Sequence, residues 1–365
     1  MLNSSRMRFP LMLIALLAVL AAMWAGLQRL AWALPSLTPG LVTQHGPLMV
    51  GGFLGTLVSL ERAVALGRPW TYLAPVSAAL GAIAFLVGAP PVLGALLLVV
   101  SGAGLIGVFI LILRRQPTLF NAVMLVGAVA WAIGNVLMLA GQAISILVYW
   151  WMAFLVLTVV GERLELSRLL RLRAVDRGLF LAALALFGAG VVVTVIAPDA
   201  GVRTAGAGML GLALWLLRYD IARRTVRRGP HGLTRYIAAC MLAGYGWLAI
   251  GGLLALLFGL QSGGPRYDAI LHSVFLGFIF SMIFGHSPII LPAVLKVPVP
   301  FRPALYLPVA LLHLSLALRV ASDLLGLFTV RQWGGMLNVV AILAFLSLIA
   351  WGALSARRAV QEVAA

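Results

Sequence analysis

Residues 41–66 read LVTQHGPLMVGGFLGTLVSLERAVAL, and this segment indicates the class of fold that the chain adopts. Between His45 near its start and Glu61-Arg62 near its end, it holds only apolar residues, glycine, one proline, one threonine and one serine. A run of about 18 or more such residues can cross the hydrocarbon core of a bilayer as a helix. The segment therefore predicts a membrane-spanning helix with a histidine at one end. An ionisable side chain in such a helix is costly, so His45 needs an explanation.

The composition extends this prediction to the whole chain of 365 residues, of which 63% are hydrophobic and 10% are charged. A soluble domain has about 45–50% apolar and about 25% charged residues, so we expect an all-α integral membrane protein. The net charge of +17 indicates basic cytoplasmic loops, not nucleic-acid binding, because no basic run is interleaved with aromatic residues in a folded domain. The single cysteine, Cys240, excludes an intrachain disulfide and a cysteine-based metal centre.

Proline, glycine and arginine clusters divide the chain into twelve apolar runs, which we assign to one polytopic membrane domain, 1–365. The predicted spans are 9–33, 42–66, 70–88, 91–113, 119–141, 144–166, 178–197, 203–219, 233–260, 269–295, 304–325 and 332–355. The first run follows a basic head, as in a signal peptide, but it is longer than the apolar part of such a peptide. We therefore expect it to be retained as the first helix.

Basic residues alternate between the two ends of these spans. The tails and every second loop hold all but five of the 26 lysines and arginines, and the loop after 144–166 includes Arg168 and Arg171. The five exceptions are Arg29, Arg203, Arg266, Arg319 and Arg331. Because basic residues concentrate in cytoplasmic loops, we expect both termini in the cytoplasm. Arginine far outnumbers lysine, as is typical of GC-rich bacterial genomes, so the expected location is the bacterial inner membrane.

Two histidines lie in the first turn of spans that both run from outside to inside. They are His45 in 42–66 and His272 in 269–295, so we expect them at matched depth near the outer surface. Two neutral imidazoles from facing helices suit the axial positions of a six-coordinate haem iron. The open alternative is that each histidine only bonds a backbone carbonyl or a Ser or Thr side chain of a neighbouring helix.

Glycines accompany both histidines and would leave room for a flat macrocycle, although glycines in membrane helices also serve helix packing. These glycines are Gly46, Gly51, Gly52, Gly55, Gly277 and Gly285.

A second pair, His286 and His313, also matches in depth, nearer the inner ends of the spans 269–295 and 304–325. We predict a second site there, for copper or another haem. The alternative is that Gly285 and Pro288 break the helix and that His286 satisfies a freed carbonyl. His231 lies in a basic loop and is expected to be solvated.

Glu-Arg pairs occupy the inner ends of two spans, as Glu61-Arg62 and Glu162-Arg163. Ion pairing at the interface would explain them. The functional alternatives are a proton or quinone site, or arginine clamps for haem propionates. With His286 at a comparable depth four helices later, the pairs suggest three pseudo-symmetric groups of four helices.

The motif TQHGPLM at 43–49 resembles the helix-2 motif of the haem–copper oxidase subunit I superfamily, and LHSVFLGF at 271–278 resembles the start of its helix 10. This resemblance implies three four-helix arcs with His45 and His272 as ligands of a low-spin haem b. Within the superfamily, the chain is most similar to the NnrS family of haem- and copper-containing proteins linked to bacterial nitric oxide metabolism. That similarity lies in TVVGERLELSRLL at 158–170, LLHLSLALRVASDLLG at 311–326 and WGGMLNVVAILAFLSLIAW at 333–351.

The chain departs from the superfamily at its reductase centre. Reductases of this kind need three further histidines on helices 6 and 7, but the spans 144–166 and 178–197 contain none. We therefore do not expect oxygen or nitric oxide reduction of the usual binuclear type, and whether the protein is an enzyme stays open. The paired histidines of the NnrS motif are reduced to His45 in HGPLM, which weakens the prediction of copper more than that of haem.

These features predict a bacterial inner-membrane b-type haem protein in electron transfer or in the response to nitric oxide and nitrosative stress. The expected partners are the lipid bilayer and a quinone or redox protein, and a second copy of the chain stays open. Two alternatives remain: a transporter, and a cofactor-free assembly factor for a respiratory complex. Transporters tend to show repeats of six helices, and the sequence shows no such repeat.

Overall fold

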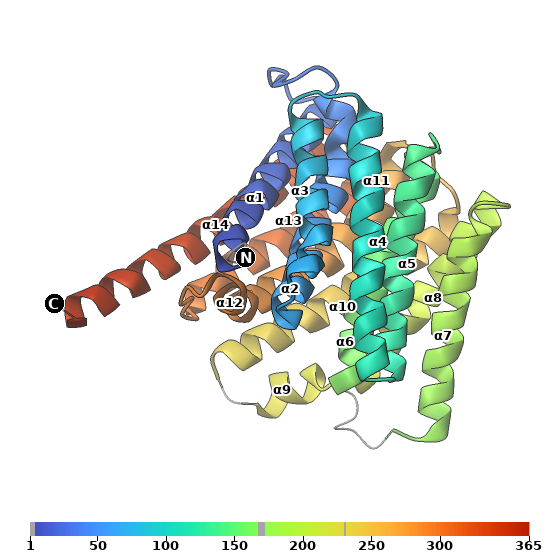
Figure 1. The fold of residues 1–365 in the computed structure, drawn as a ribbon. Helices are drawn as coiled ribbons and strands as arrows, with labels where there is room; N and C mark the ends of the chain where they lie inside the picture. Colours follow the sequence, from blue (N-terminus) through green and yellow to red (C-terminus); the bar gives the residue numbers. More distant parts are fainter. Residues whose placement is uncertain (1–3, 167–171, 230, 365) are drawn as a thin grey trace. The chain divides into compact units, whose positions relative to one another are not determined.

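The computed structural model of the chain describes residues 4–166, 172–229 and 231–364. In this part of the chain the fold is all-helical, with 86% helix and no strand (Figure 1). Twelve helices among these residues are long and apolar enough to cross a membrane. The predicted all-α class and the predicted number of long apolar helices are therefore confirmed. Arg168 and Arg171, which contribute to the predicted charge asymmetry, lie outside the described residues.

The twelve helices lie close to the predicted ranges. They are Met7–Arg29, Pro47–Leu66, Pro69–Leu86, Pro91–Arg115, Leu119–Leu139, Ile144–Leu166, Ala174–Val193, Pro198–Arg228, Leu233–Phe258, Gly264–Leu295, Pro303–Leu325 and Phe328–Ala356. Two of the differences have clear local reasons. The second helix begins later than predicted because Leu41–Gln44 form a separate 3₁₀ turn. This turn follows Gly40, which has a left-handed backbone conformation with φ of 75°. The eighth is longer because α9 (Ala222–Arg228) directly follows α8 (Pro198–Tyr219).

By its packing the chain divides into two compact units, Met1–Glu162 and Arg163–Ala365, which we call unit 1 and unit 2. The boundary falls at the end of the sixth of the twelve long helices. This division gives six helices to each unit. The grouping into three sets of four therefore stays a prediction.

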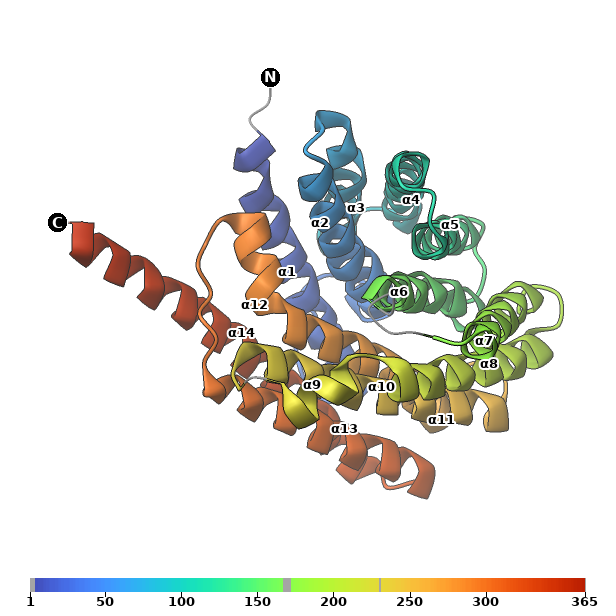
Figure 2. The same ribbon diagram turned by 90° about the horizontal axis from the view of Figure 1, so that it is seen from below.

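Unit 1 contains a π-helical segment, η2 (Pro47–Gly55), that leads directly into the second α-helix. Its α-helices are α1 (Ser4–Arg29), α2 (Thr56–Leu66), α3 (Leu73–Leu86), α4 (Pro91–Arg115), α5 (Leu119–Leu139) and α6 (Ile144–Leu166). Helix α4 lies beside both α3 and α5, as Figure 2 shows. Close approach of α5 and α6 depends on Gly127, where a Cβ would lie 3.1 Å from the carbonyl oxygen of Phe154.

Unit 2 contains a second π-helical segment, η5 (Ser273–Phe280), which joins two α-helices into one continuous run. Besides α8 and α9, its helices are α7 (Ala174–Val193), α10 (Leu233–Phe258), α11 (Gly264–His272), α12 (Ser281–Leu295), α13 (Tyr306–Leu325) and α14 (Phe328–Ala364). Helices α7 and α8 meet backbone to backbone, because a Cβ on Gly190 would lie 2.2 Å from the amide nitrogen of Ala205. Small residues allow such contacts between membrane helices.

Pro288 does not break its helix, unlike in the alternative considered for His286, since α12 continues to Leu295. A proline removes the hydrogen bond to the carbonyl four residues earlier, here that of Phe284. The hydroxyl of Tyr236 on α10 donates to that oxygen at 3.1 Å, so the freed acceptor is satisfied from a neighbouring helix. His286 instead faces the carbonyl of Met282 on its own helix, at 2.8 Å from Nδ1. This contact of His286 is thus with a main-chain carbonyl other than the one that Pro288 frees.

Candidate functional site

His45 stands just before the π-helical segment of unit 1, and α1 fixes the orientation of its ring. The Nδ1 atom lies 2.7 Å from the carbonyl oxygen of Ala22. Because a carbonyl only accepts, Nδ1 carries the proton of the neutral imidazole and Nε2 carries the lone pair. Gly26 makes room for the ring, since a Cβ there would lie 3.0 Å from Cε1 of His45.

His272 stands at the same kind of position in unit 2, as the last residue of α11 directly before η5. Its Nδ1 lies 2.9 Å from the main-chain oxygen of Asp268 and 3.2 Å from the Oδ1 atom of the same residue. The neutral ring therefore also has its proton on Nδ1 and its lone pair on Nε2. In both units a histidine precedes a π-helical segment, a feature that often marks functional sites.

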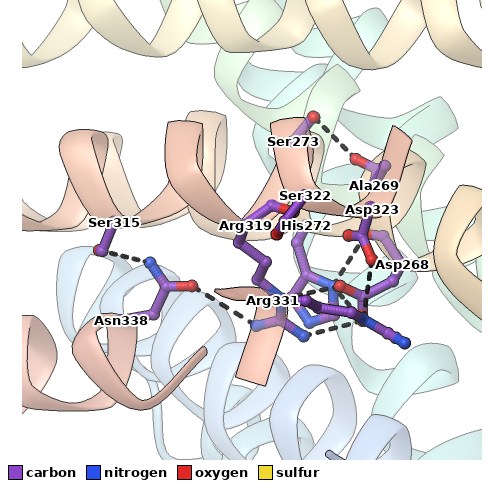
Figure 3. Close-up of polar contacts among 10 residues, drawn as sticks. All are labelled: Asp268, Ala269, His272, Ser273, Ser315, Arg319, Ser322, Asp323, Arg331 and Asn338. Atoms are coloured by element: carbon purple, nitrogen blue, oxygen red, sulfur yellow. Dashed lines mark hydrogen bonds and ion pairs between the residues drawn. The ribbon is translucent and has the colours of Figure 1, made fainter. Parts of the chain in front are cut away.

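Asp268 joins His272 to a group of charged side chains from three helices of unit 2 (Figure 3). Arg319 of α13 binds its carboxylate with two parallel contacts, Nε to Oδ2 at 2.7 Å and Nη2 to Oδ1 at 2.8 Å. Arg331 of α14 lies 3.4 Å from Oδ1 of Asp268 and 2.7 Å from Oδ1 of Asp323. We call Asp268, His272, Arg319, Asp323 and Arg331 the Asp268 cluster.

The charges of the Asp268 cluster are buried and balanced. The residues Asp268, Arg319 and Asp323 are only 8%, 6% and 4% exposed. Two carboxylates face two guanidinium groups, so the formal charges of these four side chains balance. A buried charge in an apolar segment needs such a partner, because desolvation of an unpaired ion costs several kcal/mol. The cluster therefore holds α11, α13 and α14 together, and within it Asp268 contacts the ring of His272.

The second pair of predicted ligands shows a different arrangement. The indole Nε1 of Trp247 donates to Nδ1 of His313 at 3.0 Å. Because Nδ1 accepts this bond, the proton of the neutral ring lies on Nε2, which is buried without a hydrogen-bond partner among the described residues. In this tautomer His313 offers a donor and no lone pair at Nε2. A site shared by His286 and His313 stays a prediction.

Metal-binding groups of three or more His, Cys, Asp or Glu side chains do not occur among the described residues. Haem needs only two protein ligands, so this finding about groups of three or more side chains does not test the predicted haem site. It concerns the predicted copper site. His231 is exposed and lies 3.1 Å from Arg235, as expected for a loop residue.

The two predicted Glu-Arg pairs each contribute one residue to an ion pair between helices. Arg62 of α2 binds Glu162 of α6 in an ion pair inside unit 1, and its guanidinium carbon lies 5.7 Å from the ring centroid of Phe109. Glu61 is close enough to interact electrostatically with both Arg62 and Glu162. Arg163 lies elsewhere, with Nη1 3.4 Å from the sulfur of Met241 in unit 2. The ion pair between Arg62 and Glu162 therefore connects α2 with α6.

The glycines near both histidines accommodate neighbouring side chains. A Cβ on Gly51 would lie 2.5 Å from Leu98, one on Gly55 2.8 Å from Trp131, and one on Gly277 2.4 Å from Trp247. These glycines therefore serve helix packing and give no support for a macrocycle cleft.

Sequence reasoning missed most of the Asp268 cluster. Arg319 and Arg331 had been counted only as exceptions to the charge asymmetry, and the two aspartates had not been considered. The available signal was the spacing of Asp268 with His272 and of Arg319 with Asp323, each four residues apart and thus on one helix face within an apolar segment.

The comparisons with known proteins identify a family. Residues 8–354 match the model of DUF8744, described as a domain of unknown function, and the chain belongs to this family. A comparison with curated proteins found no match.

Proposed function

We propose that this member of the DUF8744 family is a multi-pass protein of the bacterial inner membrane that binds one haem b through His45 and His272. Its role is electron transfer or the response to nitric oxide. The observation that carries the proposal is the matching local structure of the two histidines. His272 directly precedes its π-helical segment, and His45 stands two residues before its own. The Nδ1 atom of each ring lies beside a main-chain carbonyl oxygen.

The two imidazoles suit haem iron in their chemistry. Metal-ligating histidines usually donate their other ring N–H to a carbonyl or carboxylate, which fixes the tautomer and the ring plane. Ala22 does this for His45, and Asp268 does it for His272. Haem iron held by both imidazoles would supply one-electron transfer, and it would have no free coordination position for a gas. This favours electron transfer over gas reduction unless one histidine leaves.

The surrounding chain would serve this role by excluding water. The apolar helices around each histidine supply a low-dielectric environment, and burial is one of the means by which proteins set a haem potential. The arrangement in three arcs rests on the resemblance of 43–49 and 271–278 to the oxidase motifs, and the role in nitric oxide metabolism rests on the resemblance of 158–170, 311–326 and 333–351 to the NnrS family. The cytoplasmic location of both termini rests on the arginine asymmetry.

The experiment is the reduced-minus-oxidised visible spectrum of the detergent-purified protein, with iron and copper analysis of the same sample. We expect a sharp low-spin b-type signal with about one iron per chain, lost in both His45→Ala and His272→Ala. His231→Ala is the matched control, because His231 is an exposed loop residue, and it should keep the full signal. A protein that neither contains nor takes up haem or copper would refute the proposal.

A transporter is the second candidate, and one observation favours it. The chain divides into two compact units of six long helices each, and paired six-helix halves are common in transporters. Failure to bind haem, with substrate-dependent transport in vesicles, would move this candidate to first place. An assembly factor would show neither property.

A further inference from the structure

We propose that α9 is a binding surface for the headgroups of anionic phospholipids and that Asp220 holds this helix in place. Helix α9 is the short helix of unit 2 that connects α8 to α10 (Figure 1). The inference does not depend on the haem site. It rests only on the part of the proposed function that places the chain in a membrane.

Arginines form one face of α9. The helix reads ARRTVRR, so four of its seven residues are arginine and none is acidic. Arg224, Arg227 and Arg228 are exposed, and their spacing of three and four residues puts them on one face of the helix. The opposite face holds Ala222, which is buried, and Val226, which is half-buried. Helix α9 therefore has an apolar face toward the protein and a basic face away from it.

The basic face of α9 has no carboxylate beside it in the described part of the chain. There, none of the four arginines of α9 forms an ion pair. By contrast, Arg319 and Arg331 of the same unit each bind an aspartate. The positive charge of α9 is therefore free to attract an anionic partner.

Asp220 fixes α9 to its neighbouring helices. Its Oδ1 atom accepts a hydrogen bond from the amide of Ala222 at 2.7 Å, and its Oδ2 atom accepts one from the hydroxyl of Tyr245 on α10 at 3.0 Å. A side-chain oxygen that binds a free amide at a helix start favours the helix. Because Asp220 is only 5% exposed, one buried side chain both starts α9 and links it to α10. The basic face therefore keeps one orientation in unit 2.

The depth of α9 suits lipid headgroups. Helix α8 has 22 residues. At 1.5 Å per residue it is about 33 Å long, close to the thickness of the hydrocarbon core of a bilayer. Only Asp220 and Ile221 separate its end from α9. In a membrane, α9 would therefore lie at the level of the lipid phosphates.

The chemistry of α9 favours lipid phosphates over nucleic acid. A guanidinium group binds phosphate oxygens through two parallel N–H groups. A cluster of about four or more basic residues directly beside a spanning helix is typical of binding to anionic lipids. Nucleic-acid surfaces usually add aromatic side chains that stack on bases, and α9 contains none.

The test measures lipid binding by the full chain in detergent. The probes are phosphatidylglycerol and phosphatidylcholine with the same acyl chains, and native mass spectrometry counts the lipids that each protein retains. The wild type should prefer phosphatidylglycerol, and this preference should weaken at high salt. Arg224→Gln/Arg227→Gln/Arg228→Gln should lower the affinity for phosphatidylglycerol roughly 10- to 100-fold and leave that for phosphatidylcholine unchanged.

The matched control is Arg68→Gln/Arg114→Gln/Arg115→Gln. It removes the same net charge from exposed arginines of unit 1, which lie outside α9. This variant should keep the wild-type affinity for phosphatidylglycerol. Equal losses in the two triple variants would mean that the lipid responds to net charge and not to α9, and would overturn the inference. A wild type without preference for phosphatidylglycerol would overturn it as well.

Asp220→Ala tests whether α9 must be held in place. This variant makes the net charge more positive, but it removes the acceptor for the amide of Ala222 and for Tyr245. The affinity for phosphatidylglycerol should fall several-fold, and a rise or no change would contradict the role of Asp220. If this variant does not fold, the two triple variants decide the question, because they change only exposed side chains.

Inorganic phosphate and a short single-stranded RNA are the competing probes. Neither should displace phosphatidylglycerol from the wild type. Displacement by inorganic phosphate at equal concentration would assign the site to a free anion, and tighter α9-dependent binding of the RNA would assign it to nucleic acid. Either result would overturn the inference. The visible spectrum separates it from the proposed function, because the substitutions in α9 should leave any haem signal unchanged and a haem-free wild type would refute the haem site alone.

Discussion

Arg319 and Asp268 are joined by two parallel contacts of 2.7 and 2.8 Å, although 51 residues separate them in the sequence. Their side chains are only 8% and 11% exposed. Removal of one partner from such a pair leaves the other charge buried and uncompensated, which is strongly destabilising. Loss of either side chain should therefore destabilise unit 2, because the remaining charge would be buried without its partner.

Arg319→Ala should lower the free energy of unfolding by about 3–5 kcal/mol, because Asp268 would lose its bidentate partner. Denaturant titration in detergent micelles measures this change. Asp199→Ala is the control, since Asp199 pairs with Arg203 and their side chains are 58% and 42% exposed. Exposed pairs contribute about 1 kcal/mol or less. Equal effects of the two substitutions would contradict the buried character of the Asp268 pair.

Tyr236 and Pro288 should be thermodynamically coupled. Tyr236→Phe removes the hydroxyl that donates to the carbonyl of Phe284, and a buried acceptor left unsatisfied costs about 1–3 kcal/mol. In a Pro288→Ala background, the new amide of residue 288 can donate to the same oxygen, so Tyr236→Phe should cost less. A double-mutant cycle in micelles measures the coupling. Additive effects would show that the hydroxyl does not compensate for the proline.

Two glycines of α7 offer a matched test of helix packing in unit 2. Gly190→Ala should lower the unfolding free energy by about 1–3 kcal/mol, because the new Cβ would collide with the backbone of Ala205 at 2.2 Å. Gly188 lies in the same helix with nothing within 4 Å of an added Cβ. Gly188→Ala should therefore be neutral, or stabilising by up to about 1 kcal/mol. Equal losses from both would argue against close contact of α7 with α8.

Gly26 should influence His45 without contacting a ligand itself. In Gly26→Ala the added Cβ would lie 3.0 Å from Cε1 and 3.1 Å from Nδ1 of His45, so the ring must shift by a few tenths of an ångström. We expect haem affinity to fall on the order of 10-fold, because the hydrogen bond to Ala22 orients the ring. Titration of the apoprotein with haemin measures this.

Gly46→Ala is the control for Gly26→Ala. Gly46 is adjacent to His45, but a Cβ there would meet Trp151 at an ordinary distance of 3.7 Å. Haem affinity should not change in this variant. If Gly26→Ala also leaves affinity unchanged, the orientation of His45 against α1 has no part in binding.

The spans could be predicted from the sequence because their determinants are local. Apolar runs fix the helices, and residues such as Gly67 and Gly326, with φ of 65° and 71°, end them. The second and eighth boundaries were less accurate because a 3₁₀ turn and the short helix α9 are not distinguished by hydrophobicity.

The candidate site was only partly predictable, because its contacts are not local. The position of His45 at a helix start is visible in the sequence, but its bond to Ala22 depends on how α1 packs against η2. The pairing of Asp268 with Arg319 requires α11 and α13 to be neighbours, which periodicity does not reveal. Only the four-residue spacing of Asp268 and His272 can be seen in the sequence. This spacing points to a functional site only when the segment is known to be buried.

The orientation of the chain can be tested with single cysteines. The natural Cys240 is fully buried, so it should be silent toward a membrane-impermeant maleimide, and Cys240→Ala gives a clean background. Arg227→Cys and Ser262→Cys place thiols at exposed positions before and after α10. Because α10 is predicted to cross the membrane and basic residues stay in the cytoplasm, Ser262→Cys should be labelled in intact cells.

Arg227→Cys should be labelled only after the cells are permeabilised. Both positions are loop or surface sites without a role in the Asp268 cluster, so the variants should fold normally. Labelling of Arg227→Cys but not Ser262→Cys in intact cells would mean that the chain is inverted and that His45 and His272 lie toward the cytoplasm. Labelling of both from the same side would mean that α10 does not cross the membrane, and the twelve-span topology would then fail.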